Sequence, residues 1–489
     1  MCPVTGAGCS RRLPRTSVRA ALSALLVCAA LFLGGADRPQ AIAWHYAVQL
    51  SGSERARATI ELTLREVETR RVCVDMSGAS RSVRKVEQVV GEGRSVPLQK
   101  DEECWTLVNP ALRPVRVRYE YDLAGAADSF DNADYVQRHG EALTFSDEAV
   151  LLRPDPLPKL QPSPLIEIEF SVPREVQVTA PWLRIPGPGI RYQFDAAQYD
   201  GGSYVTVGKF RSLGLLALKN SRVELYVVGT AKASDETLRT WIEKAAAMSD
   251  GFYGHLMPPV VHIVLVPIAG RSSLGIFGTV LRPLRPSVVI YFGGDATELP
   301  LHDDWVAPHE IFHIGNPRVR YKIPWLVEGF TTYYQDVLRA RAGALTAEEA
   351  WSDLWDGVRK YCQPAGTSLQ SESARLRQTY HYTRVYWGGA CLALLLDVEI
   401  RTRSRGQRSL DDVMRELRAQ SLRKQLDEAA VIAVLSRATS PALVRRYLQE
   451  TKSLPVQETL RALGVEVVGP DRVRLRDDAP KSAIRRAMF

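Results

Sequence analysis

The stretch His309-Glu310-Ile311-Phe312-His313 has the form HExxH, and it decides how the rest of the chain is interpreted. On a helix, residues four apart lie on one face, so His309 and His313 can both point at one metal ion. Glu310 lies between them in sequence and can reach a metal-bound water as a general base. The pentapeptide alone is a moderate signal, because short motifs also arise by chance.

The residues after the motif supply a candidate third ligand. Gly315 and Pro317 end the first helix, Pro324 suits the first turn of a second helix, and residues 325–340 have helical composition. Glu328 lies one turn into that second helix, where its carboxylate can fold back onto the same ion. A catalytic zinc needs such a third ligand and an open fourth position. A favourable charge near a helix N-terminus is the alternative explanation of Glu328.

The residues around the motif resemble the glycyl aminopeptidase family. That family is a bacterial branch of the thermolysin-like gluzincin zinc metallopeptidases, more distantly related to the alanyl aminopeptidases. The resemblance is specific from about residue 304 to residue 417 and diffuse in the N-terminal half. It rests on His309–His313, Asn316-Pro317, Trp325–Tyr334, Tyr386–Ala390 and residues 394–401 and 409–413.

The resemblance implies a thermolysin-like catalytic domain that hydrolyses peptide bonds with one Zn²⁺ per chain. The family's three zinc ligands and its general base match, in this order, His309, His313, Glu328 and Glu310. Tyr386 matches the tyrosine whose hydroxyl stabilises the tetrahedral oxyanion, a role that suits an uncharged hydrogen-bond donor. A core aromatic on an amphipathic helix is the alternative for Tyr386, and Tyr380 and Tyr382 are nearby rivals.

The segment 270–280 departs from the aminopeptidase pattern. In the related aminopeptidases a glutamate in this region grips the free amine of the substrate, whereas here the segment reads GRSSLGIFGTV. It contains no acidic residue, and Arg271 is its only charged one. An endopeptidase or processing peptidase that needs no free amine is therefore one alternative. The other is a zinc-bearing peptide-binding protein with little turnover, against which the retained Glu310 argues, since a structural site needs no base.

The chain outside the motif predicts a multidomain α+β protein with a β-rich N-terminal half and a mainly helical C-terminal part. Short β-branched or alternating runs indicate a β-sandwich-like domain, at 46–50, 58–64, 115–121, 166–172 and 204–207. A helix is expected from Asp235 to Tyr253 with Ser234 as N-cap, followed by strands at 260–266, 274–281 and 288–292. The predicted domains are 44–230 (β-rich), 231–417 (thermolysin-like zinc peptidase) and 418–489 (helical C-terminal region and tail).

Residues 1–43 have the form of a secretory signal peptide. Arg11 to Arg19 form a basic region, Ala20 to Leu33 an apolar run, and Ala41-Ile42-Ala43 an A-x-A-like cleavage site. The apolar run is shorter than the roughly 20 residues that span a bilayer, so no stable membrane span is expected after cleavage. We expect an exported protein, periplasmic or secreted, with an uncleaved membrane anchor as the alternative.

The composition of the 489 residues is that of a globular protein of two to four domains, with 45% apolar and 24% charged residues. Half of the formal net charge of +8 lies in residues 1–43, which hold five arginines and one aspartate. No cluster of basic residues interleaved with aromatics occurs, so a nucleic-acid partner is not expected. The expected partner is a peptide or protein substrate.

The cysteines fit an oxidising compartment. Three of the seven lie in the leader, and the other four offer two possible pairs, Cys73 with Cys104 and Cys362 with Cys391. No CxxC spacing occurs, so we do not expect cysteines to bind a metal.

Overall fold

The structure of the protein is a computed structural model. It describes residues 42–51, 56–65, 67–129, 135–157, 163, 165–196, 201–256, 260–282, 285–320, 323–364, 366–440 and 442–489. Residues 1–41 of the predicted leader lie outside this range, so the signal-peptide prediction is not addressed. Within the described ranges, no helix has both the length and the apolar character needed to cross a membrane.

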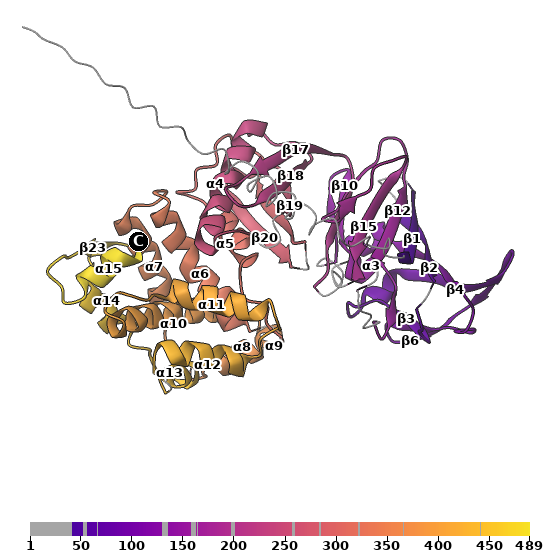
Figure 1. Cartoon of the computed structure of the whole chain (residues 1–489). Coiled ribbons are helices and arrows are strands. Elements are labelled where there is room, and N and C mark those ends of the chain that lie inside the picture. The colour runs from indigo at the N-terminus through magenta and orange to yellow at the C-terminus, as the bar shows by residue number, and fades with distance from the viewer. Residues whose placement is uncertain are drawn as a thin grey trace, which may run out of the picture. The chain divides into compact units, whose positions relative to one another are not determined.

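A five-stranded sheet carries the elements that lead to the HExxH motif. Its order is β17 (Phe210–Ala217), β18 (Arg222–Val228), β19 (Val260–Ile268), β21 (Ser287–Gly293) and β20 (Gly275–Leu281). The inner strands β18, β19 and β21 are parallel, and the near-continuous buried runs of β19 and β21 are typical of strands buried on both faces. β20 joins antiparallel to β21 and forms one edge of the sheet. Figure 1 shows α4 (Asp235–Tyr253) and α5 (Val306–His313) beside this sheet.

The predicted start of α4 is confirmed, because the Ser234 side chain accepts a hydrogen bond from Thr237 N. The helix ends at Gly254, which adopts a left-handed conformation with φ of 82°. Downstream of α5 the chain is mainly helical. The helices are α6 (Pro324–Arg341), α7 (Ala347–Tyr361), α8 (Leu369–Ala374), α9 (Leu376–Thr379), α10 (Tyr382–Arg403), α11 (Leu410–Ser421), α12 (Glu428–Ala438), α13 (Leu443–Gln449), α14 (Val456–Leu463) and α15 (Ser482–Met488). A short hairpin, β22 (Val465–Val467) and β23 (Val473–Leu475), lies between the last two.

The helices α6 and α10 pack closely, which brings two parts of the predicted site together. A Cβ atom on Gly329 would lie 2.4 Å from the Cα of Gly389, so only glycine fits at this crossing. Both glycines belong to the segments that carry the family resemblance, and Glu328 and Tyr386 lie beside them in sequence.

The N-terminal part is built from three sheets, as expected for a β-rich domain. The largest has the order β14 (Leu183–Arg184), β15 (Ile190–Asp195), β12 (Leu165–Ser171), β1 (Ile42–Ser51), β2 (Arg57–Leu64), β8 (Val115–Asp122), β4 (Val83–Gly91) and β5 (Arg94–Pro97). The second joins β13 (Gln177–Thr179), β16 (Tyr204–Gly208), β10 (Ala142–Ser146) and β9 (Val136–His139). The third joins β11 (Arg153–Asp155), β3 (Arg71–Cys73), β7 (Cys104–Thr106) and β6 (Gln99–Asp101). The described residues of this part also form the short helices η1 (Ala79–Ser82), α2 (Leu123–Ala127) and α3 (Asp147–Val150).

The hydrophobic cores divide the chain earlier than the predicted boundary at residue 230. The two large cores extend from Ala43 to Val207 and from Leu213 to Met488, and a small third cluster joins Tyr204 to Val264 across this division. The strands β17 and β18, which we placed in the N-terminal domain, pair with β19 in the sheet next to the motif. The second core also includes residues after 417, so the C-terminal helices pack on the same core as α5 and α6.

Both predicted cysteine pairs form disulfides. Cys73–Cys104 joins β3 to β7, and Cys362–Cys391 joins the end of α7 to α10. The second bridge fixes α7 to the helix that carries Tyr386.

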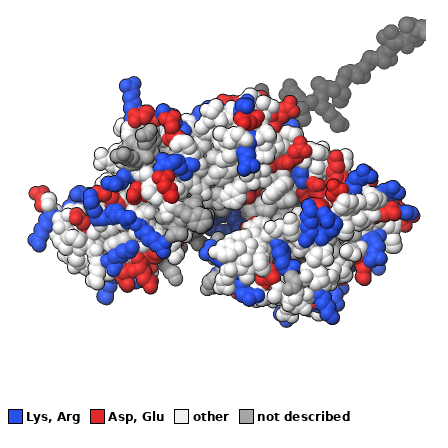
Figure 2. Space-filling view, turned by 180° about the vertical axis from the view of Figure 1, so that it is seen from behind, with Lys and Arg blue, Asp and Glu red and all other residues white. Residues whose placement is uncertain are grey.

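On the face that Figure 2 shows, basic and acidic side chains are interspersed among uncharged ones. This distribution agrees with a sequence that has no block of basic residues.

Candidate metal centre

The helix α5 presents the HExxH motif, and a buried aspartate fixes where it begins. Asp304 accepts hydrogen bonds from Val306 N at 2.8 Å and Ala307 N at 3.3 Å. The same carboxylate accepts a hydrogen bond from Trp241 Nε1 of α4 at 2.7 Å. These contacts satisfy free N–H groups at the helix N-terminus and attach α5 to α4.

The structure brings the three predicted ligands together. Glu328 Oε2 lies 3.3 Å from His313 Nε2 and 3.7 Å from His309 Nε2. The three ligand atoms lie within 4.8 Å of one another. In a tetrahedral zinc site with bonds of about 2.1 Å, ligand atoms are about 3.4 Å apart. The donor set, two imidazole nitrogens and one carboxylate oxygen, and its spacing therefore fit a zinc ion.

A hydrogen bond at the far side of the His309 imidazole favours metal binding through its Nε2. His309 Nδ1 lies 2.8 Å from Gln335 Oε1, and an amide oxygen only accepts, so His309 carries its proton on Nδ1 and Nε2 keeps its lone pair for the metal. His313 Nδ1 lies 3.1 Å from Asn316 Nδ2 and 3.5 Å from Thr331 Oγ1.

Asn316 joins the end of α5 to the start of α6. Its Nδ2 donates to Val327 O at 3.1 Å and to Thr331 Oγ1 at 2.8 Å, and it lies 3.1 Å from His313 Nδ1. Because Val327 precedes Glu328, this amide fixes the backbone that carries the third ligand.

The pKa values of the two carboxyl groups at the site, Glu310 and Glu328, are shifted in opposite directions. Burial raises the pKa of Glu310 above its ordinary value, and the carboxylate of Glu328 acts in the same direction. Burial opposes ionisation of Glu328 too, but when the imidazoles are protonated the charge of His313 and hydrogen bonds from both rings outweigh it and hold the pKa of Glu328 well below its ordinary value. Glu328 is thus the permanent anion, and Glu310 is the group that binds a proton more readily.

Tyr386 lies beside both carboxylates. Burial, followed by the negative charges of Glu328 and Glu310, raises the pKa of its phenol well above the ordinary value. The phenol therefore stays protonated and remains a hydrogen-bond donor. Tyr380 and Tyr382 were the alternatives to Tyr386 as oxyanion donor. Tyr382 lines the cavity next to the metal centre that is described below, whereas Tyr380 is exposed.

The edge strand β20 passes directly over Glu310. A Cβ atom on Gly278 would lie 2.3 Å from Glu310 Cγ and 2.8 Å from its Cδ. The absence of a side chain at this position therefore allows the carboxylate to lie between the strand and the two histidines.

We expect Gly278→Ala to lower kcat/KM by about tenfold or more, because a misplaced catalytic group is costly even when the displacement is about 1 Å. The added methyl must push the Glu310 side chain aside, while the backbone conformation suits alanine. Peptide hydrolysis and thermal unfolding of the variant provide the measurement, and the melting temperature should change little. Gly251→Ala is the matched control, since a Cβ there has no neighbour within 4 Å. Wild-type kcat/KM for Gly278→Ala would contradict this role of the strand.

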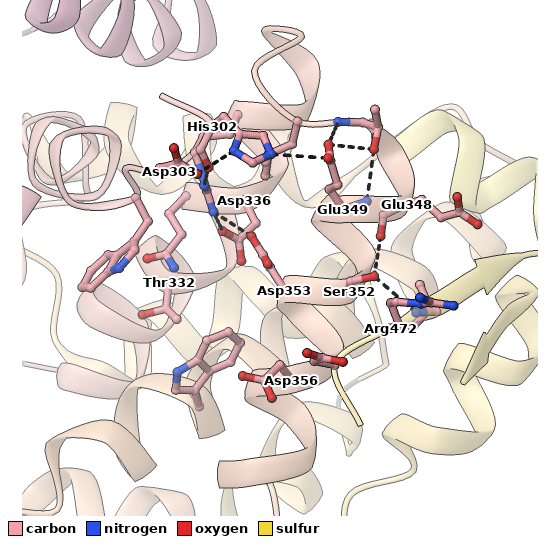
Figure 3. Close-up of a pocket in the computed structure, with 18 of the residues that line it drawn as sticks. His302, Asp303, Thr332, Asp336, Glu348, Glu349, Ser352, Asp353, Asp356 and Arg472 are labelled. Atoms are coloured by element: carbon pink, nitrogen blue, oxygen red, sulfur yellow. Dashed lines mark hydrogen bonds and ion pairs between the residues drawn. The ribbon is translucent and has the colours of Figure 1, made fainter. Parts of the chain in front are cut away.

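A cavity of about 1170 Å³ opens from this centre, and it is lined by His309, Tyr386, Trp305, Thr332 and Gln335 among others. Figure 3 shows its far side, where acidic residues of α7 face Asp336 and His302. Two further histidines lie in this region: His302 lines the cavity, and His381 is exposed beside Glu372.

The sequence reasoning missed Gln335, Thr331 and Gly278. Gln335 lies seven residues after Glu328, two turns along the same face of α6. Thr331 lies three residues, or about one turn, after Glu328. That spacing was a usable signal. For Gly278 the sequence offers no comparable signal, because its role depends on how β20 crosses α5.

Comparisons with known proteins agree with this geometry. The model of the M61 glycyl aminopeptidase family matches residues 315–387, a segment that contains Glu328 and Tyr386. A search of curated proteins found no match.

Several solved structures share the fold. An aminopeptidase N family protein from Idiomarina loihiensis is 18% identical with a TM-score of 0.71, over 86% of this chain and 78% of that one. An M1 zinc metallopeptidase from Deinococcus radiodurans is 16% identical with a TM-score of 0.54, over 84% of this chain and 94% of that one. Yeast LTA4 hydrolase is 13% identical with a TM-score of 0.52, over 89% of this chain and 74% of that one. The matched segment confirms the resemblance to the glycyl aminopeptidase family, and the solved structures show that the chain shares the fold of these metallopeptidases.

Proposed function

We propose that the protein hydrolyses peptide bonds with one zinc ion per chain, held by His309, His313 and Glu328. The observation that carries this proposal is the approach of Glu328 Oε2 to both Nε2 atoms, at 3.3 and 3.7 Å. Zinc bound there polarises the scissile carbonyl and lowers the pKa of a water molecule at the open position.

Glu310 acts as the general base in this proposal. Its raised pKa suits a group that takes a proton from the attacking water and later gives it to the leaving amine. The close approach of Gly278 limits the positions that the Glu310 carboxylate can take beside the two histidines.

Tyr386 donates a hydrogen bond to the oxyanion. Because its pKa is raised, the phenol keeps its proton next to two carboxylates. An uncharged donor fixed in a water-poor site stabilises negative charge that develops only during the reaction.

The strand β20 holds the peptide in an extended form. It is the edge of its sheet, so its outer N–H and C=O groups are available to an added strand. Its exposed apolar residues, Ile276 at 39% and Phe277 at 57%, offer contacts for alternate side chains of that peptide.

The residues around the metal centre offer little that would bind the free N-terminal amine of a substrate. The segment 270–280 has no acidic residue, and Asp304 is committed to Trp241 and to the N-terminus of α5. A desolvated ammonium group needs opposite charge nearby. These facts favour a peptidase that does not depend on a free amine over a strict aminopeptidase.

We therefore expect acetylation of a peptide's N-terminus to cost less than about tenfold in kcat/KM, or about 1.4 kcal/mol of transition-state binding. The measurement is a matched pair of free and acetylated peptides, with cleavage positions determined by mass spectrometry. A loss of several hundredfold would instead show that another residue anchors the amine and would restore the aminopeptidase interpretation. Zinc binding without turnover of any peptide in a library would support the peptide-binding alternative.

A further inference from the structure

The cavity beside the metal centre has an acidic wall that the proposed chemistry does not use. Seven of its lining residues are carboxylates, and three are arginines. Four of the acids come from α7, where Glu349, Asp353 and Asp356 follow one another at helical spacing and Glu348 lies beside them. Figure 3 shows this row facing Asp303 and Asp336 across the cavity.

One of these carboxylates is buried without a full set of partners. Asp336 is 1% exposed, and its Oδ1 accepts from Arg339 Nη2 at 2.6 Å. Its Oδ2 has no hydrogen-bond partner in the part of the chain that the structure describes. Burial raises the pKa of Asp336 to about 6, which is the behaviour of a carboxylate that lacks compensating charge.

The internal cations neutralise this wall only in part: Asp356 is paired with both Arg359, at 2.8 Å, and Lys360, but the other acids share fewer cations. Arg339 is shared between Asp336 and Asp353, and the distance to Asp353 Oδ2 is 3.0 Å. His302 is likewise shared between Asp303 at 2.7 Å and Glu349 at 3.3 Å. Arg339 and His302 therefore each contact two carboxylates. The cluster around each of them keeps a net negative charge. The other two lining arginines, Arg472 and Arg474, lie on or next to β23 at the exposed end.

Aromatic side chains line the way from the metal ligands to the acids. Trp305 is 46% exposed, and its ring lies 5.6 Å from that of His309. Tyr382 is 43% exposed and lies next to Tyr386. Exposed aromatic faces beside carboxylates provide the two attractions that a cationic side chain uses, cation–π contact and ion pairing.

We propose that this cavity binds the cationic side chain of a substrate residue next to the scissile bond, so that the enzyme prefers peptides with arginine or lysine there. The proposal rests on the proposed peptidase function and names its substrate class. Arginine suits the cavity best, because a planar guanidinium can stack on an aromatic ring and donate to two carboxylates at once.

A long side chain fits the geometry better than an α-amine does. Among the described residues, Glu328 is the acidic side chain in direct contact with the two histidine ligands; Gln335, Asn316, Thr331 and Trp305 are uncharged, and Arg282 donates to His313 O at 2.9 Å. The acidic row lies beyond them on a neighbouring helix. An ammonium group two bonds from the scissile carbonyl stays close to the metal, whereas a guanidinium at the end of a long chain can reach the row.

The test compares arginine with citrulline, which has nearly the same shape and no charge. Peptides carry one or the other on either side of the scissile bond. For the wild-type zinc enzyme we expect kcat/KM to favour arginine by about tenfold or more at one of the two positions, the scale of a charge-assisted contact. A ratio below about threefold at both positions would overturn the proposal.

Variants then locate the preference in the cavity. Asp353→Asn should lower the arginine-to-citrulline ratio of kcat/KM by about fivefold or more, and Glu348→Gln by about threefold. Asp353→Asn removes a partner of Arg339 and could disturb the local structure. Glu348 is exposed, so Glu348→Gln tests the cationic pocket without that disturbance. Glu458→Gln, an exposed glutamate of α14 outside the cavity, is the control and should leave the ratio unchanged. An unchanged ratio in both cavity variants would also overturn the proposal.

A binding measurement separates this proposal from the proposed function. Zinc-loaded Glu310→Gln should bind the arginine peptide about tenfold more tightly than the citrulline peptide, whether or not the wild type turns over either. Absence of turnover by zinc-loaded wild type would refute the peptidase function alone. Equal dissociation constants for the two peptides would refute the cationic pocket alone.

Discussion

Glu310→Gln is expected to give a folded, zinc-loaded protein whose kcat is at least about 100-fold lower than that of the wild type, the scale on which loss of a general base is felt. Glutamine keeps the length and helix propensity of the side chain and fits beneath Gly278. The glutamine amide is too weak a base to accept a proton from the attacking water. Because Glu310 does not belong to the three-ligand set, zinc binding should survive.

Three measurements on the Glu310→Gln variant are needed together. Circular dichroism checks the fold, metal analysis the zinc content, and steady-state kinetics the turnover of a peptide found in a library digest. Glu458→Gln removes one carboxylate from the surface in the same way and should keep wild-type kcat. Hydrolysis near the wild-type rate by zinc-loaded Glu310→Gln would eliminate the mechanism in which this residue moves the proton.

The local structure around the motif could be predicted because local signals determine it. Ser234 caps α4 as expected, β20 lies within one residue of its predicted range, and α6 begins at Pro324. Each boundary depends on a residue whose own chemistry starts or stops an element. The approach of Glu328 to His309 and His313 was predicted from helix periodicity and the family resemblance, and the structure brings the three together.

The features that were missed depend on which elements meet in space. The residues of β17 and β18 were placed in the β-rich N-terminal domain without individual strands being predicted, and nothing in a short apolar run tells which sheet it will join. The acidic residues of α7 look like an ordinary solvated helix face in sequence. They become one wall of a cavity because the Cys362–Cys391 bridge and the packing against α6 bring α7 close to the metal centre.

Replacing a histidine ligand is expected to abolish stoichiometric zinc binding. In His309→Ala or His313→Ala, two protein ligands remain, and Glu328 loses one of the two imidazoles that hold its pKa low. After dialysis against a mild chelator, the wild type should retain about one zinc per chain and each variant well under a tenth of that, because a catalytic zinc relies on three protein ligands. His255→Ala, an exposed histidine away from the site, is the matched control.

Thermal unfolding gives a second measurement of the same prediction that does not depend on activity. A ligand that binds only the folded state stabilises it by about 2.7 kcal/mol when its free concentration is 100 times the dissociation constant. Added zinc should therefore raise the unfolding temperature of the metal-free wild type and of His255→Ala, and leave both ligand variants unchanged. If His309→Ala and His313→Ala both kept their zinc and showed the same thermal shift as the wild type, the metal would have to be bound elsewhere. The 3.3 and 3.7 Å contacts of Glu328 would then be ordinary ion pairs between a carboxylate and two imidazoles.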